Sequence, residues 1–172
     1  MELRREEDGD ALEIGRVHSD AFRMAVGSEQ VPLEVTLVDL LRASEAWLPA
    51  LSLVAVIEGE IVGHVLCSRA DLDSDPVLAL GPIGVKVEHQ NRGIGSALIT
   101  AVIAEADAAN ESLIGLLGSP AYYRRFGFVP SSELGVEPPD PDWSDHFQVR
   151  ILSAYDPALV GRFRYPPAFD LS

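Results

Sequence analysis

The stretch Gln90–Leu98 reads QNRGIGSAL, and its two glycines lie between an apolar run and an alanine-rich amphipathic segment. Glycine lets a ligand or a second piece of backbone come close. The start of a helix also presents unpaired N–H groups and the positive end of the helix dipole. The stretch therefore predicts a strand, a glycine turn and a helix start that together bind an anion, most often a phosphate.

The apolar run before this turn, LALGPIGVKV at Leu78–Val87, contains a proline that an interior strand should not have. Pro82 cannot donate a ladder hydrogen bond, and Gly81 and Gly84 weaken the pleat. A bulge would explain all three residues and would free backbone N–H and C=O groups from one neighbouring strand. The pantetheine arm of coenzyme A carries amides and ends in a pyrophosphate. The arm therefore fits the unpaired backbone of the bulged strand, and the pyrophosphate fits the phosphate-binding turn that follows it. The alternative is an edge strand protected by its proline.

Hydrophobic spacing along the rest of the chain predicts one α/β domain over residues 1–172, with a mixed, mostly antiparallel sheet. About seven strands and about four helices are expected, and the bulged strand is the fourth. The expected elements, in chain order, are a short strand near residues 3–5, a helix that begins after DGD at 8–10, a helix over Leu33–Arg42, a hairpin over 51–68 that turns at Gly59, the strand over 78–87, a helix over Gly93–Ala109, a strand over 112–118, a short helix over 120–126, a strand start at 127–130, a loop over 137–145, a strand over 146–152 and an irregular tail over 164–170.

The composition excludes several classes of protein. Lys and Arg number 13 and Asp and Glu number 27, so the net charge is −14, which repels nucleic acid and attracts cationic partners. Solubility is the more common reason for such acidity and explains most of that charge. Cys67 is the one cysteine, so an internal disulfide or a cysteine zinc cluster is excluded. We expect no metal, no membrane association and a cytoplasmic location, because the charged start MELRREEDGD has no apolar segment behind it.

Two motifs resemble one known family. QNRGIG at Gln90–Gly95 is similar to the signature of the GCN5-related N-acetyltransferases, which is Gln or Arg, two residues, Gly, one residue, and Gly or Ala. PAYYRRFGF at Pro120–Phe128 resembles that family's aromatic helix followed by a short strand. The order of elements matches over nearly the whole chain, and the second motif looks most like an uncharacterised bacterial branch of predicted acetyltransferases. A Walker loop fits less well, since Gly95 is followed by Ser96 and Ala97 and not by Lys and Ser or Thr. A dinucleotide fingerprint also fits less well, since it requires a third small residue where this chain has Leu98 and an acid on the following strand.

The resemblance implies acetyl-CoA as co-substrate and a site on the bulged strand and the glycine turn. By this match, the Val85 amide faces the acetyl carbonyl, and the amides of the turn bind the pyrophosphate with added charge from Arg92. The residues that the resemblance assigns to coenzyme A are Ile83, Gly84, Val85, Val87, Gln90, Asn91, Arg92, Gly93, Ile94, Gly95 and Ser96. Arg124 and Arg125 either reach the adenosine end or are plain solvated surface.

Tyr123 is the candidate proton donor, because it stands five residues before Phe128 as the family's tyrosine stands before its own Gly-Phe. A phenol is a suitable acid for a thiolate of similar basicity. Tyr122 is expected to pack the helix on the sheet. The strand SLIGLLG before this helix has no acid, so the general base is His64, Glu88 or water. A structural role for His64 is the more common outcome for a buried histidine.

The sequence thus predicts a single-domain N-acetyltransferase that transfers an acetyl group directly to an amine-bearing small molecule or protein. We expect the acceptor pocket to be built by the first two helices and the EPPDPDWSD region, and the chain to be a monomer or a homodimer. The alternatives are a non-catalytic acyl-CoA sensor of the same fold and an acetyltransferase toxin acting on charged tRNA. The net charge of −14 speaks against the toxin.

Overall fold

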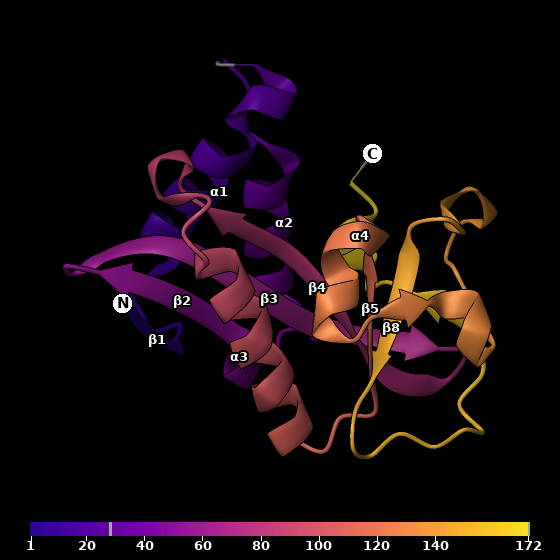
Figure 1. Ribbon diagram of the computed structural model, residues 1–172. Helices are drawn as coiled ribbons and strands as arrows, with labels where there is room; N and C mark the ends of the chain where they lie inside the picture. The colour runs from indigo at the N-terminus through magenta and orange to yellow at the C-terminus, as the bar shows by residue number, and fades with distance from the viewer. Residues whose placement is uncertain (28, 172) are drawn as a thin grey trace.

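The computed structural model describes residues 1–27 and 29–171, which form a twisted mixed sheet with helices on both faces (Figure 1). The described residues form nine strands and four α-helices, joined by several single 3-10 turns. The strands are β1 (Glu2–Arg5), β2 (Ser52–Ile57), β3 (Glu60–Leu72), β4 (Asp75–Val85), β5 (Leu113–Leu117), β6 (Val129–Pro130), β7 (Val136–Glu137), β8 (Phe147–Ile151) and β9 (Gly161–Arg164), and the helices are α1 (Ala11–Val26), α2 (Leu33–Arg42), α3 (Ile94–Ala108) and α4 (Pro120–Tyr123).

The strand order β1-β2-β3-β4-β5-β8-β6 makes β4 an interior strand, and β9 joins the far end of β3 and also pairs with β7. Pairing is antiparallel except between β4 and β5 and between β7 and β9. The predicted mixed, mostly antiparallel sheet is confirmed, with somewhat more strands than the expected seven. The short strands β7 and β9 are the additions, and β9 lies just before the tail that the sequence pattern leaves irregular.

The bulge in β4 is the feature that opens the sheet. Across β3 and β4, Val65 pairs with Ile83 but Cys67 pairs with Leu80, so Gly81 and Pro82 together oppose one residue of β3. On its other side, β4 pairs with β5 only at Leu78 and Ala79. The predicted bulge and the predicted loss of one neighbour are therefore both present, and the edge-strand alternative is wrong because β4 lies between two strands.

Helices α3 and α4 cover one face of the sheet, and α1 and α2 cover the other. The apolar stripe of α3, which includes Leu98, Val102 and Ala106, packs on Val65 and Cys67 of β3. Leu66, between those two strand residues, faces the opposite way and packs with α1 and α2. This alternation along one strand places a helix layer on each face.

A third cluster of buried side chains joins the C-terminal part of the chain to the sheet. Phe147 of β8 and Phe163 of β9 are fully buried, and their ring centroids lie 4.9 Å apart. Tyr165 packs on Phe163 with ring centroids 5.2 Å apart. This aromatic cluster fixes the segment after β9 against the sheet near the bulge.

Within residues 1–27 and 29–171, no helix combines the length and apolar character that crossing a bilayer requires.

Candidate active site

A cavity of about 530 Å³ lies where the end of β4, the start of α3 and the α4 segment meet. Nine of the eleven residues that the family resemblance assigns to coenzyme A line it. Tyr122, Tyr123 and Arg125 close the side formed by α4 and the turn that follows it. The lining residues taken from the sequence are Ile83, Gly84, Val85, Gln90, Asn91, Gly93, Ile94, Gly95 and Ser96. We refer to this space as the donor cavity.

The backbone of β4 turns polar groups toward the donor cavity. The Lys86 amide donates to the Val62 carbonyl of β3 at 2.9 Å. Because successive residues of a strand point their N–H and C=O groups to opposite sides, Ile83 and Val85 point theirs away from β3. That side has no β5 pairing beyond Ala79. The Val85 carbonyl accepts a hydrogen bond from the Gln90 side chain at 2.9 Å, which ties the glycine turn to the strand.

The start of α3 supplies further N–H groups. Gly93 precedes the helix with φ 82°, a left-handed conformation that favours glycine, and Asn91 also has a positive φ of 62°. Ala97 is the first residue whose amide bonds back to this turn, to the Gly93 carbonyl at 3.0 Å. The amides of Ile94, Gly95 and Ser96 therefore have no helical acceptor. Together with the helix dipole, these amides form the anion-binding site that the sequence predicts.

Two of the assigned residues lie outside the donor cavity. Val87, which the resemblance assigns to the wall around the pantetheine arm, is 52% exposed, and its amide donates to the Asp20 carboxylate of α1 at 2.7 Å. Arg92 is exposed on the turn and does not line the cavity. Of the two arginines after α4, Arg125 lines the cavity and Arg124 does not. Arg125 lies over the Tyr122 ring, 4.7 Å from its centroid.

The two tyrosines of α4 differ in their surroundings. Burial raises the pKa of Tyr123, with a smaller contribution from Tyr122, so the phenol keeps its proton at neutral pH. The Tyr123 ring packs on Phe128 with centroids 5.9 Å apart. The Tyr122 hydroxyl lies 3.4 Å from the Ser96 hydroxyl at the start of α3. Tyr122 therefore packs as expected. It also contacts Ser96 at the anion-binding site, and the sequence pattern does not indicate that contact.

His64 belongs to a buried chain of hydrogen bonds. The Glu6 carboxylate accepts from the Ser52 hydroxyl at 2.7 Å, so Ser52 in turn accepts from Nε2 of His64 at 2.8 Å. Nδ1 of His64 must then accept from Nε2 of His18, also at 2.8 Å. Both nitrogens of His64 are engaged, and burial lowers the pKa values of both histidines, that of His18 to about 4. The structural role for His64 fits this geometry.

The buried chain of hydrogen bonds from Glu6 to His18 ends beside β4. Nδ1 of His18 is buried and has no hydrogen-bond partner among the described residues. A side chain at Gly84 would place its Cβ 2.8 Å from that nitrogen. The other candidate base, Glu88, has an exposed side chain and lines neither the donor cavity nor the cavity described next.

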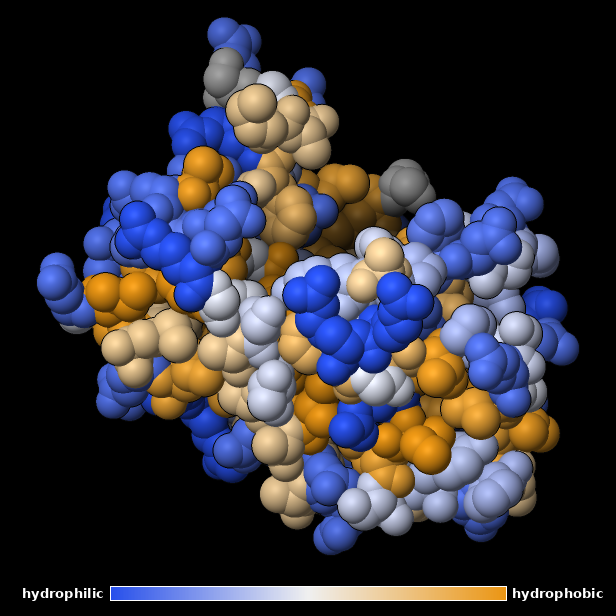
Figure 2. Space-filling view, in the orientation of Figure 1, coloured by the Kyte–Doolittle hydropathy of each residue, from blue (hydrophilic) through white to orange (hydrophobic). Residues whose placement is uncertain are grey.

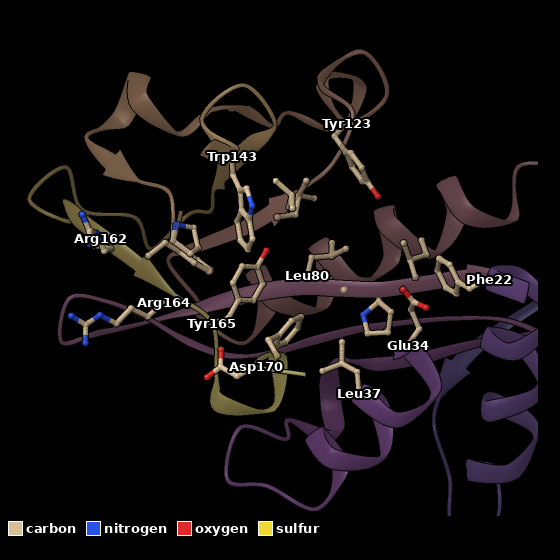
Figure 3. A pocket seen from close by; sticks show the side chains of 18 residues that line it. Phe22, Glu34, Leu37, Leu80, Tyr123, Trp143, Arg162, Arg164, Tyr165 and Asp170 are labelled. Atoms are coloured by element: carbon tan, nitrogen blue, oxygen red, sulfur yellow. The ribbon is translucent and has the colours of Figure 1, made fainter. Parts of the chain in front are cut away.

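A second cavity, of about 900 Å³, lies on the other side of the bulge (Figure 3). We refer to it as the acceptor cavity. The two cavities share Phe22, Ile83 and Tyr123 and therefore meet at those three residues. Figure 2 shows the molecule hollowed between the α1–α2 side and the C-terminal end, with an apolar floor. The hydroxyl of Tyr123 points toward the region where the cavities join (Figure 3).

Besides β4, β5 and Tyr123, four parts of the chain contribute walls to the acceptor cavity. Phe22 belongs to α1, Glu34 and Leu37 to α2, and Trp143 to the EPPDPDWSD region, as the sequence predicts for an acceptor pocket. The fourth wall, Arg162–Asp170, is not predicted, because β9 and the proline-rich tail carry no motif. Within the part of the chain that the structure describes, no three His, Cys, Asp or Glu side chains are grouped as a metal ion would require.

Comparison with known proteins agrees with this geometry. Residues 17–128, which contain both motifs and the bulged strand, match the model of the acetyltransferase (GNAT) family. An uncharacterized N-acetyltransferase of Escherichia coli K12, YjhQ, is 33% identical over 163 residues, which are 90% of this chain and 86% of that protein.

Two crystal structures are similar over nearly the whole chain. A GNAT-family acetyltransferase from Brucella melitensis in complex with acetyl-CoA is 33% identical and has a TM-score of 0.79, covering 98% of this chain and 97% of its own. The E. coli N-acetyltransferase YhbS in complex with CoA is 24% identical and has a TM-score of 0.87, covering 98% of this chain and 91% of its own. At 24% identity, the likeness to YhbS shows that the two chains share a fold.

Proposed function

Because this chain belongs to the acetyltransferase (GNAT) family and is an N-acetyltransferase, we propose that it binds acetyl-CoA in the donor cavity and transfers the acetyl group directly to an amine in the acceptor cavity. One observation carries the proposal: β4 loses its pairing with β5 beside a helix start whose amides are free. The pantetheine arm replaces the missing strand, and the pyrophosphate lies on the amides of Ile94–Ser96. The Brucella relative, in complex with acetyl-CoA, supports this choice of donor.

The transfer follows from where the two cavities meet. The neutral amine attacks the thioester carbon, a C–N bond forms, and the carbonyl oxygen takes the negative charge. The Val85 amide, which points away from β3, donates to that oxygen. The C–S bond then breaks, and the Tyr123 hydroxyl gives its proton to the thiolate. The amine's surplus protons restore the phenol and reach solvent, so an ammonium and acetyl-CoA yield an amide, free coenzyme A and one proton.

Gly95→Val tests the donor cavity with little effect on the fold. Gly95 lies inside α3, and a Cβ there meets only the Tyr122 hydroxyl at 3.7 Å and a Val85 methyl at 3.9 Å, so the added side chain occupies the cavity. We expect calorimetric binding of acetyl-CoA to fall below detection while the melting temperature stays close to that of the parent. Gly93→Val is less informative, because φ 82° strains any other residue there.

Thr100→Val, on the exposed side of α3, is the matched control and should bind acetyl-CoA normally. A folded Gly95→Val variant with the parent's affinity would place coenzyme A elsewhere.

We assign the acceptor to the class of amine-bearing small molecules or proteins. The two other hypotheses, a non-catalytic sensor and a toxin acting on charged tRNA, gain no support from the structure or from the comparisons.

A further inference from the structure

The acceptor cavity has an aromatic lining that the transfer reaction itself does not require. The chain has six Phe, four Tyr and two Trp residues, and six of these twelve line this cavity. Trp143 and Tyr165 meet edge to face with centroids 6.4 Å apart, and Tyr165 and Phe169 lie 4.5 Å apart. Leu37, Leu80 and Leu116 complete the apolar surface. Such walls favour a ring or another flat apolar body over a water-soluble chain.

Glu34 adds a negative charge on the α2 side of this cavity. Its carboxylate points from α2 toward β4, while the Tyr123 hydroxyl approaches from the opposite wall (Figure 3). Glu34 is half-buried, and among residues 1–27 and 29–171 no hydrogen bond or ion pair engages its carboxylate. By contrast, Arg162, which also lines the cavity, is paired with Glu137 at 3.3 Å. An unpaired carboxylate in an apolar wall binds a cation more strongly than one in open water.

We propose that the acceptor is a primary amine carried on an apolar, ring-bearing small molecule, and that Glu34 is the counter-ion that holds its ammonium group. This inference rests on the proposed function. The ring lies among Trp143, Tyr165 and Phe169, and the ammonium lies between Glu34 and the junction of the two cavities. The volume of about 900 Å³ suits a molecule of drug size, which such walls can enclose. Glu34 is thus a specificity residue that orients the nitrogen toward the thioester.

Binding of 2-phenylethylamine, measured by calorimetry with and without coenzyme A, tests this inference without relying on turnover. We expect saturable binding that Glu34→Gln weakens by roughly tenfold to hundredfold, the range for a hydrogen bond to a charged group. Asp39→Asn is the matched control, because it removes the same charge from the same helix at an exposed side chain paired with Arg42. It should leave the affinity unchanged.

Two probes separate the charge from the ring. The alcohol 2-phenylethanol keeps the ring and lacks the ammonium, so it should bind more weakly than the amine and equally well to the parent and to Glu34→Gln. Butylamine keeps the ammonium and lacks the ring, so it should bind more weakly than 2-phenylethylamine. Equal binding of amine and alcohol, or an unchanged affinity in Glu34→Gln, would overturn the assignment of Glu34. Equal binding of butylamine would overturn the ring-bearing class.

Steady-state kinetics distinguish this inference from the proposed function. A binding role predicts that Glu34→Gln raises KM for 2-phenylethylamine by a similar factor and changes kcat much less. A collapse of kcat with an unchanged KM contradicts the counter-ion role, and a lysine peptide used with higher kcat/KM contradicts the small-molecule class. In both cases acetyl transfer itself still stands. Loss of the proposed function has another signature, the failure of the parent chain to bind acetyl-CoA, while the amine titration still decides the role of Glu34.

Discussion

At the scale of single residues, Tyr123 is the side chain that both cavities share and that carries a transferable proton. Its pKa is raised by burial, so it is protonated across the neutral range. The hydroxyl of its neighbour Tyr122 lies 3.4 Å from the Ser96 hydroxyl, and Tyr122 lines the donor cavity but not the acceptor cavity. The two phenols therefore differ in the reaction that each can serve, although they are adjacent in sequence.

Tyr123→Phe keeps the ring and its packing on Phe128 but removes the proton. A general acid contributes about 10²–10⁴-fold to a rate, so we expect kcat to fall toward that range with little change in acetyl-CoA affinity or melting temperature. Tyr122→Phe should cost far less in kcat. Steady-state rates with a saturating amine measure both variants. A Tyr123→Phe variant as active as its parent means that water delivers the proton, and a damaging Tyr122→Phe means that the roles are exchanged.

The buried pair His18 and His64 predicts how stability depends on pH. Burial lowers both pKa values from 6.5, that of His18 to about 4, whereas the unfolded chain takes up protons near 6.5. The contribution is therefore complete above pH 6.5 and is lost as the pH falls from 6.5 toward 4, by about 1.4 kcal/mol per pH unit for each proton that only the unfolded state binds. Asp10, whose pKa is lowered from 3.8 by Arg4, acts only at lower pH.

Urea unfolding at pH 7.5, 6 and 5 measures this dependence. In His18→Gln, which keeps a side-chain amide for His64 but cannot be protonated in this range, the slope of unfolding free energy against pH should drop most between pH 6 and 5, where it approaches the limit of about 1.4 kcal/mol per pH unit for one proton. A variant that keeps the parent's slope would show that His18 does not titrate on unfolding.

At the scale of elements, the position of α1 on β4 depends on a missing side chain. Gly84 lies opposite His64 on β3, and an added Cβ would stand 2.8 Å from His18 and 3.4 Å from Ala21 of α1. Gly84→Ala should therefore lower the free energy of unfolding by about 1–3 kcal/mol, the usual cost of overpacking. Gly15→Ala is a control of opposite sign: inside α1 its Cβ meets only Val35 at 3.8 Å, so the variant should gain about 0.5–1 kcal/mol. Chemical denaturation measures both, and a neutral Gly84→Ala would mean that α1 shifts freely.

Elements were predictable where local chemistry determines them. Gly81 and Pro82 interrupt a strand in any context, so the bulge could be inferred before the structure was known, and α2 has the bounds expected from its leucine spacing. The strands β7 and β9 have two and four residues and are held by distant partners, so no local pattern marks them. The same reason hid Glu34: its helix was expected, but the face that meets the acceptor cavity depends on how the tail after β9 packs against α2.

At the scale of the whole molecule, the net charge of −14 gives the protein a negative electrostatic field. A field of this kind concentrates cations, and salt screens it over about 10 Å at 0.1 M and about 3 Å at 1 M. We therefore expect KM for a cationic acceptor to rise severalfold between these two salt concentrations. Initial rates in sodium chloride at saturating acetyl-CoA measure the effect, with kcat as the internal reference. A KM that is flat or falls with salt would indicate that the overall charge serves solubility alone.

Among the described residues, the two cavities have only Phe22, Ile83 and Tyr123 in common. Mutations in Trp143, Tyr165 or the other walls of the acceptor cavity can therefore accumulate without touching the residues that hold the donor. Such separation gives a lineage room to change what it modifies while its energy-rich reagent stays the same. For enzyme engineering, it means that a library confined to Glu34, Leu37 and Arg162–Asp170 would explore new acceptors on an unaltered donor platform.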